Sequence, residues 1–205
     1  MVLKIYLARH GQDEDNAAGI LNGHRNQPLT KLGEGQAQSV AAKILQSKLQ
    51  FDKIYASPLQ RAFKTAEILA NGKQSVQVMD LLIERDFGVM AGVPTKEIKE
   101  RCQGNILQTE TISYFLSPEG AETFPELLER GNKVIEDIQS KHKGGGSVLL
   151  VTHGDFGKML YAAYYKLDWM DVLEQFHFGN SEVLLLAEES SPGEAHVFQI
   201  QQYNS

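Results

Sequence analysis

Two histidines in this sequence share one local setting, each after a short apolar run and directly before a glycine. The first run is Leu7-Ala8-Arg9-His10-Gly11 and the second is Val151-Thr152-His153-Gly154. Sites in open α/β sheets form outside the carboxyl ends of the strands, so two such strands can place His10 and His153 across one site. The glycine after each histidine lets the main chain turn sharply and leaves room for a ligand close to the backbone.

Two arginines can bring positive charge to the same place. Arg9 directly precedes His10, and Arg61 lies in a predicted helix after the next predicted strand. A planar guanidinium group suits the oxygens of a phosphate. Because the formal net charge is −6, the positive charge that holds a phosphate would have to be local.

The elements that must position these residues alternate between strands and helices, which predicts an α/β layered fold. Val2 to Ala8 reads as the strand before His10. Ser147 to Thr152 is a continuous apolar run, typical of a central strand that is covered on both faces, and it leads into His153. Lys53 to Ala56 is a brief strand, and Ser57 as N-cap with Pro58 at the first helical position would begin the helix that carries Arg61.

The remaining segments complete this alternation. We expect a helix over 33–49 with Thr30 as its N-cap, a strand over 76–79, a loop-rich segment over 84–114, helices over 123–141 and 156–165, and a closing hairpin of 183–187 with 196–200.

The motifs in this order resemble the histidine phosphatase superfamily, which is also called phosphoglycerate mutase-like. Arg9-His10-Gly11 resembles its RHG signature, and Val151-Thr152-His153-Gly154 is similar to its second histidine motif. Three further segments resemble family motifs: Asn22-Gly23 with Pro28-Leu29-Thr30, Gly33, Gln36 and Ala37; Ser57-Pro58-Leu59-Gln60-Arg61-Ala62 with Thr65-Ala66; and Leu82 to Gly88 with Gly92. The resemblance implies a three-layer α/β/α sandwich around a mostly parallel sheet, formed by one domain over 1–205.

The resemblance also implies a catalytic role for five residues. His10 would attack phosphorus and carry a phosphohistidine, while Arg9, Arg61 and His153 would surround the phosphoryl oxygens. Glu84 would donate a proton to the leaving oxygen and then activate the water that clears His10. For this, nearby phosphate charge and partial burial would have to raise the pKa of Glu84.

Other residues are candidates for substrate binding or rivals for the acid role. Asn16 has the spacing of the family's phosphate-contacting asparagine. Gly23 and His24 share a loop that could reach substrate, and Arg85 and Gly154 each adjoin a catalytic residue. Three carboxylates compete with Glu84 as the acid, namely Asp13, Glu14 and Asp86.

Within the family, three features favour a phosphatase over a mutase. The segment from Val93 to Phe115 is short and poor in cations, Asp155 stands where mutases have Asn, and Pro118 to Thr123 is similar to a segment of the phosphatases. Lys158 departs from the Arg that many phosphatases of the family have. We expect small phosphomonoesters as substrates, with a mutase and a non-catalytic binder of phosphorylated ligands as alternatives.

No cofactor or metal is needed for this scheme, and no HxH or HExxH spacing indicates a metal site. The acidic charge argues against nucleic acid or an anionic membrane as a partner. With no signal-like or membrane-length apolar stretch, the cytoplasm is the expected location. The rings of Tyr161, Tyr164, Tyr165 and Trp169 would suit a homodimer contact or, equally, the core and helix surface.

Overall fold

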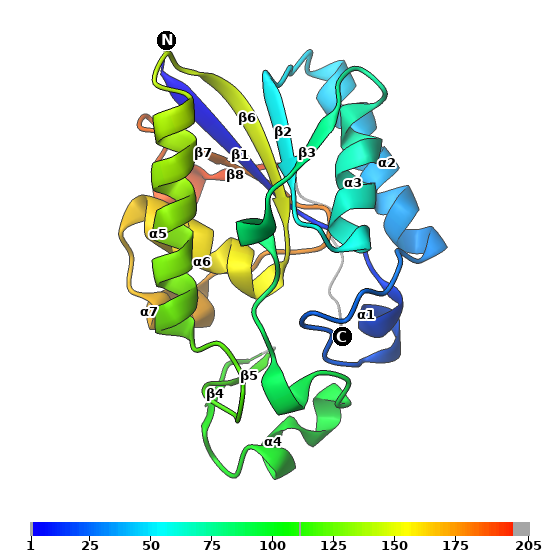
Figure 1. Ribbon diagram of the computed structural model, residues 1–205, viewed down its shortest axis with the longest axis vertical. Helices are drawn as coiled ribbons and strands as arrows, with labels where there is room; N and C mark the ends of the chain where they lie inside the picture. The colour runs from blue at the N-terminus through cyan, green and yellow to red at the C-terminus, as the bar shows by residue number, and fades with distance from the viewer. Residues whose placement is uncertain (1, 111, 199–205) are drawn as a thin grey trace.

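A six-stranded sheet forms the centre of the molecule in the computed structural model, which describes residues 2–110 and 112–198 (Figure 1). The strands lie in the order β3-β2-β6-β1-β7-β8. Their bounds are β1 (Leu3–Arg9), β2 (Lys53–Ala56), β3 (Val76–Val78), β6 (Gly146–Thr152), β7 (Val183–Leu186) and β8 (His196–Phe198). The pairs β3–β2, β2–β6 and β6–β1 are parallel, and β7 and β8 are antiparallel additions, so the predicted mostly parallel sheet is confirmed.

Helices cover both faces of this sheet (Figure 1). On one side lie α2 (Lys31–Gln46) and α3 (Gln60–Ala70), and on the other lie α5 (Phe124–Lys141), α6 (Gly154–Tyr165) and α7 (Trp169–Gln175). The predicted three-layer α/β/α sandwich is therefore confirmed. None of the helices in the described residues is long and apolar enough to cross a membrane.

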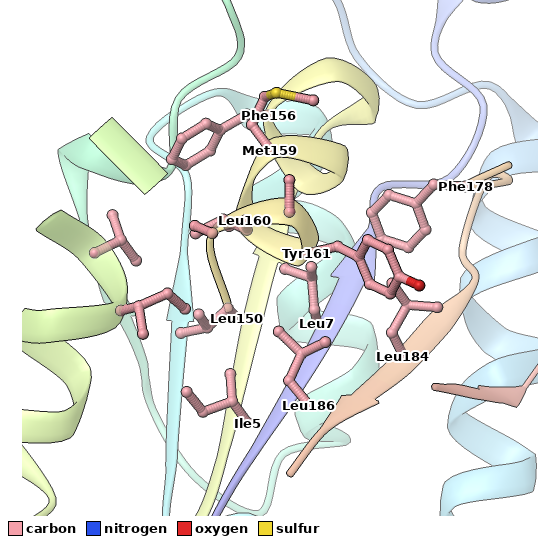
Figure 2. Close-up of a cluster of buried hydrophobic side chains, with 14 of the residues drawn as sticks. Ile5, Leu7, Leu150, Phe156, Met159, Leu160, Tyr161, Phe178, Leu184 and Leu186 are labelled. Atoms are coloured by element: carbon pink, nitrogen blue, oxygen red, sulfur yellow. The ribbon is translucent and has the colours of Figure 1, made fainter. Parts of the chain in front are cut away.

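Side chains that alternate along β1 build the two halves of the core. Ile5 and Leu7 pack toward α5 and α6, whereas Tyr6 and Ala8 pack toward α2 and α3. Figure 2 shows the first half, in which Leu7 lies between its register partners Leu150 of β6 and Leu184 of β7, beneath the side chains of α6.

Local capping explains where two of the long helices begin. The Thr30 hydroxyl accepts a hydrogen bond from the backbone N–H of Gly33 at 3.0 Å, and Thr123 forms a capping box with Glu126. The prediction for Ser57 was wrong: α3 begins at Gln60 after the N-cap Leu59. Ser57 precedes that N-cap; its hydroxyl accepts from the backbone N–H of Leu59 at 3.3 Å and also bonds to His153.

Most predicted bounds agree with the structure to within three residues. The helix expected over 156–165 begins two residues earlier, because His153 rather than a later residue is its N-cap. The closing hairpin is present from Val183 to Phe198, with η4 (Pro192–Glu194) in its connection; the predicted end at residue 200 lies outside the described residues.

The loop-rich middle contains more regular structure than expected. The short helix η1 (Asp80–Leu82) precedes this segment. The segment itself folds into η2 (Gly88–Met90), η3 (Thr95–Glu97), α4 (Ile98–Arg101) and the antiparallel pair β4 (Ile106–Gln108) and β5 (Ser113–Phe115). Five buried side chains give it a small core of its own, namely Phe87, Met90, Val93, Ile98 and Phe115. In Figure 1 this segment extends below the sheet, on the side of the carboxyl ends of the parallel strands.

The aromatic cluster packs within the chain. Tyr161 stacks on Phe176 with 4.0 Å between ring centroids, Trp169 stacks on Phe124 at 5.6 Å, and the Tyr165 hydroxyl bonds to Ser190. These contacts lie within the chain, and the homodimer contact stays a prediction.

Candidate active site

The parallel strands bring His10 and His153 together at one edge of the sheet. Arg9 and Thr152 are register partners at the ends of β1 and β6, and the backbone N–H of His10 donates to the carbonyl of Thr152 at 3.0 Å. Both imidazoles are buried, with ring centroids 5.0 Å apart and planes at 61°. The two histidines thus face one another across one site.

The surroundings of His10 determine which of its ring nitrogens carries the hydrogen and which carries the lone pair. Nδ1 lies 2.6 Å from the Gly11 carbonyl, which accepts only if Nδ1 carries the hydrogen. Nε2 is therefore the acceptor, and Arg61 Nε donates to it at 3.3 Å. Burial, followed by the charges of Arg61 and Arg9, lowers the pKa of His10 well below its usual value, so the imidazole is neutral.

Arg61 is fully buried, and backbone carbonyls hold its guanidinium group in place. Nη1 donates to the Arg25 carbonyl at 2.6 Å and Nη2 to the Gly23 carbonyl at 2.8 Å. Nε also lies 3.1 Å from the Asp13 carboxylate, which offsets the cost of burying the charge. Gly23 therefore orients Arg61 through its backbone carbonyl.

Arg9 lies close to the backbone of Gly154. A Cβ atom added to Gly154 would lie 3.4 Å from the Arg9 guanidinium carbon, so glycine leaves room for this close approach. Nη1 of Arg9 donates to the Phe178 carbonyl at 2.7 Å, while its buried Nε has no hydrogen-bond partner among the described residues. A buried unpaired donor beside two histidines is suited to an oxyanion.

His153 is held by Ser57, whose role the sequence did not reveal. The Ser57 hydroxyl lies 2.8 Å from His153 Nε2, and Nδ1 is buried without a partner in the described part of the chain. Burial, then Arg61 and His10, lower the pKa of His153 well below its usual value. Ser57 belongs to the segment that resembles a family motif, which is the signal that could have found it.

Glu84 is buried between the loop that carries it and the first turn of α6. Its Oε1 accepts from the backbone N–H groups of Arg85 at 2.8 Å and Phe156 at 3.0 Å, and its Oε2 accepts from that of Asp155 at 3.3 Å. Burial is the main cause that raises the pKa of Glu84, and the charge of Asp155 raises it further. The hydrogen bonds from Arg85 and Phe156 lower that pKa, but by less. A raised pKa is the property that a general acid requires.

The rival carboxylates are less suited to the acid role. Asp13 pairs with Arg61 and accepts hydrogen bonds from Asn16 and Asn22. Glu14 is exposed, and the side chain of Asp86 is 48% exposed, 3.8 Å from His24 Nδ1.

Two of the predicted substrate-binding residues, Asn16 and His24, contact residues that support this cluster. Asn16 is on α1 (Glu14–Ala18), where its Oδ1 accepts from Asn180 Nδ2 at 3.3 Å. The neighbouring Ser181 donates its backbone N–H to the His10 carbonyl at 3.1 Å, so Asn16 is tied to the turn that supports His10. His24 is partly exposed, and its Nε2 lies 2.8 Å from the Glu84 carbonyl.

The structure places Arg85 among aromatic rings, and the substrate-binding role expected of it stays a prediction. Its fully buried guanidinium group lies over the rings of Phe124 and Phe115, 4.1 and 4.5 Å from the centroids. It donates to the carbonyls of Glu122 and Leu116, and Asp155 lies 3.6 Å from Nη1. Arg85 therefore supports the packing and offsets the charge of Asp155.

Lys158 is buried one turn along α6 from Gly154. Its ammonium group bonds to the Tyr114 hydroxyl and lies 4.8 Å from the centroid of that ring. Burial lowers the pKa of Lys158 to about 8. No group of three or more His, Cys, Asp or Glu side chains that could hold a metal ion occurs in residues 2–110 and 112–198.

The chain as a whole is similar to proteins of a known family. The profile of the histidine phosphatase superfamily (branch 1) matches residues 5–200. Over 169 residues the chain is 32% identical to a metal-independent phosphoserine phosphatase of Arabidopsis thaliana, which covers 78% of this chain and 68% of that protein. Over 167 residues it is 30% identical to a 2,3-bisphosphoglycerate-dependent phosphoglycerate mutase of Mesorhizobium japonicum, covering 78% and 80%.

A solved structure agrees with these sequence matches. Phosphoserine phosphatase from Entamoeba histolytica, in complex with 3-phosphoglyceric acid, superposes with a TM-score of 0.74 at 26% identity over 89% of each chain. The profile match spans nearly the whole sequence and includes both histidine motifs. The chain belongs to the histidine phosphatase superfamily.

Proposed function

We propose that the protein is a metal-independent phosphatase that hydrolyses small phosphomonoesters through a phosphohistidine on His10. The observation that carries the proposal is the state of His10: a buried, neutral imidazole whose Nε2 lone pair lies among Arg61, Arg9 and His153. Such a nitrogen is a competent nucleophile toward phosphorus.

In the first step, the lone pair of His10 Nε2 forms a bond to phosphorus while the bond from phosphorus to the leaving oxygen breaks. Glu84 gives its proton to that oxygen, so an alcohol leaves. The Arg61 Nε–H, which donates to Nε2 in the free enzyme, becomes available to a phosphoryl oxygen. Together with Arg9 and His153 it stabilises the charge of the transition state.

In the second step, the Glu84 carboxylate takes a proton from water as the water oxygen attacks phosphorus. The bond from phosphorus to Nε2 breaks, and its electron pair returns to His10. Inorganic phosphate leaves, and Glu84 is again protonated. The raised pKa of Glu84 suits both halves of this cycle.

Two relatives support small phosphorylated acids as the substrate class, since both carry the name phosphoserine phosphatase. The segment from η2 to β5 and the loop over 12–27 would select among such esters, because they border the carboxyl ends of the strands (Figure 1).

A phosphoglycerate mutase is the second candidate, since several relatives of about 30% identity carry that name. A mutase must hold a second acidic group of its substrate. Of the three cations between Val93 and Phe115, Lys96 and Lys99 are exposed and Arg101 is paired with Glu97 at 2.8 Å. This supports a phosphatase. Phosphoryl transfer between phosphoglycerates that depends on a bisphosphorylated primer would instead identify a mutase.

The experiment is hydrolysis of p-nitrophenyl phosphate near pH 6 with EDTA present, comparing wild type with His10→Ala. We expect wild-type activity that EDTA does not reduce and that the substitution abolishes. Activity retained in His10→Ala would exclude His10 as the nucleophile. Loss of wild-type activity with EDTA would exclude a metal-independent reaction.

A further inference from the structure

Arg130 of α5 reaches the loop that carries Glu84 and binds three of its backbone carbonyls. Nη1 donates to the carbonyls of Leu81 and Ile83, both at 2.8 Å, and Nη2 donates to the carbonyl of Glu84 at 3.3 Å. A single guanidinium group thus holds the main chain on both sides of the turn into Glu84.

Glu122 fixes the orientation of that guanidinium group. Arg130 Nε lies 2.9 Å from Glu122 Oε1, and Nη2 lies 2.7 Å from Oε2. The pair is bidentate, which is the geometry that restricts an arginine most. The two side chains are 14% and 20% exposed, so solvent competes little with these contacts.

Arg130 also touches the other support of Glu84. Its guanidinium carbon lies 3.9 Å from the ring centroid of Phe156, and the backbone N–H of Phe156 is a donor to the Glu84 carboxylate. Arg130 therefore contacts both the loop that carries the carboxylate and the first turn of the helix that binds it.

We propose that Arg130, oriented by Glu122, is a positioning residue that holds the Glu84 carboxyl group where it protonates the leaving oxygen. The proposal rests on the proposed function of Glu84 as general acid. Arg130 does not touch the reacting atoms; it acts through the main chain of Leu81 to Glu84 and through Phe156.

Leaving groups that differ in basicity separate this role from a merely structural one. An alkyl phosphate needs a proton on its leaving oxygen, whereas p-nitrophenolate leaves without one. The value of kcat/KM covers the steps up to the release of this first product. A misplaced Glu84 therefore lowers kcat/KM for the alkyl ester alone, whereas a smaller fraction of folded enzyme lowers both values equally.

The test compares Arg130→Gln with Lys133→Gln, using phosphoserine and p-nitrophenyl phosphate on the same preparation. Lys133 is a matched control: it lies one turn further along α5, is exposed, and pairs only with Glu129 among the described residues. For Arg130→Gln we expect the ratio of kcat/KM for phosphoserine to that for p-nitrophenyl phosphate to fall roughly tenfold or more. For Lys133→Gln the ratio should stay at the wild-type value.

Glu122→Gln should lower the ratio in the same direction, and adding it to Arg130→Gln should cause little further change, because the two act as one unit. An unchanged ratio in Arg130→Gln would overturn the proposal, whether kcat/KM falls equally for both esters or for neither. The His10→Ala comparison decides the proposed function separately, since it does not depend on this ratio.

Discussion

At the scale of single residues, burial has opposite consequences for His10 and Glu84. It lowers the pKa of the imidazole and raises that of the carboxyl group. A neutral nucleophile and a protonated acid can therefore exist together at mildly acidic pH. For side chains exposed to water, the pKa of histidine is higher than that of glutamate. Between the two pKa values the histidine is protonated and the glutamate is ionised, which is the reverse of what the proposed reaction requires.

The substitution Glu84→Gln tests whether Glu84 is the general acid. Gln cannot give up a proton, so kcat/KM for phosphoserine should fall by roughly 10²–10⁴ while that for p-nitrophenyl phosphate changes much less. In wild type, activity on phosphoserine should decline as the pH rises through the raised pKa of Glu84, because the acid form is lost. The variant should lack that decline apart from the ionisation of the substrate itself.

A pH–rate profile for each ester and each enzyme provides the check. An unchanged phosphoserine rate in Glu84→Gln would contradict the acid role and return Asp13 and Asp86 to consideration.

Residues with a local signal were the ones that could be predicted. His10, His153 and Arg61 stand in short motifs, each of which comes after a predicted strand. The contact of Ser57 with His153 joins residues far apart in the chain, and only the family-like motif around Ser57 points to a role for it. The contacts of Arg130 with the loop of Glu84 are also distant in sequence, and nothing in the neighbourhood of Arg130 shows them. The side chain of Arg85 enters a cluster of aromatic rings, and the sequence does not show which way that side chain points.

At the scale of elements, the start of α2 sets the path of the chain after His10. Gly33 in the first turn of α2 packs directly on the main chain of Gln12, and a Cβ atom added to Gly33 would lie 2.0 Å from the Gln12 carbonyl oxygen. A Cβ atom added to Gly11 would lie 2.3 Å from the Gly33 carbonyl oxygen. The loop after His10 and the start of α2 therefore require glycine at their contact.

We predict that Gly33→Ala destabilises the fold by about 1–3 kcal/mol or more and lowers activity, because two stretches of main chain must separate. The matched variant is Gly35→Ala in the same helix, where an added Cβ atom meets nothing within 4 Å. It should stabilise the protein by about 0.5–1 kcal/mol through helix propensity. Urea denaturation of both variants checks the pair, and equal effects would contradict the packing argument.

The elements found from the sequence are those that carry their own signals. The helices α2 and α5 have N-caps and long amphipathic faces, and β6 is a continuous apolar run. In contrast, α4, β4 and β5 span only three or four residues each. Contacts among Phe87, Met90, Ile98 and Phe115 stabilise that segment, so local sequence alone gives little indication of it.

At the scale of the whole molecule, an acidic protein concentrates positive charge in one place. The net charge is −6, yet Arg9, Arg61 and the two neutral histidines converge at the carboxyl ends of β1 and β6. Burial strengthens the attraction of these arginines for an anion, since little water screens it. The site should therefore bind a phosphate-like anion even though the surface repels anions at long range.

Orthovanadate, which adopts the five-coordinate geometry of phosphoryl transfer, should therefore stabilise the fold. At about 100 times its Kd it would add about 2.7 kcal/mol. For a domain of this size, that free energy corresponds to a rise in Tm of roughly 5–10 °C. Thermal melts with vanadate and no chelator check this, because EDTA itself binds vanadate. Arg61→Gln should lose the shift relative to its own ligand-free Tm. A shift of equal size in Arg61→Gln would place the anion elsewhere.

Trapping the phosphoryl group on His10 is the most direct test of the proposed phosphohistidine. Glu84→Gln should accumulate the intermediate from p-nitrophenyl phosphate, because the first step needs no acid for this leaving group whereas the second needs Glu84 as base. An alkaline quench followed by peptide mass analysis should find one phosphoryl group on His10, stable to alkali and lost in acid. A phosphoryl group on another residue, or turnover with none on His10, would exclude His10 as the residue that carries it.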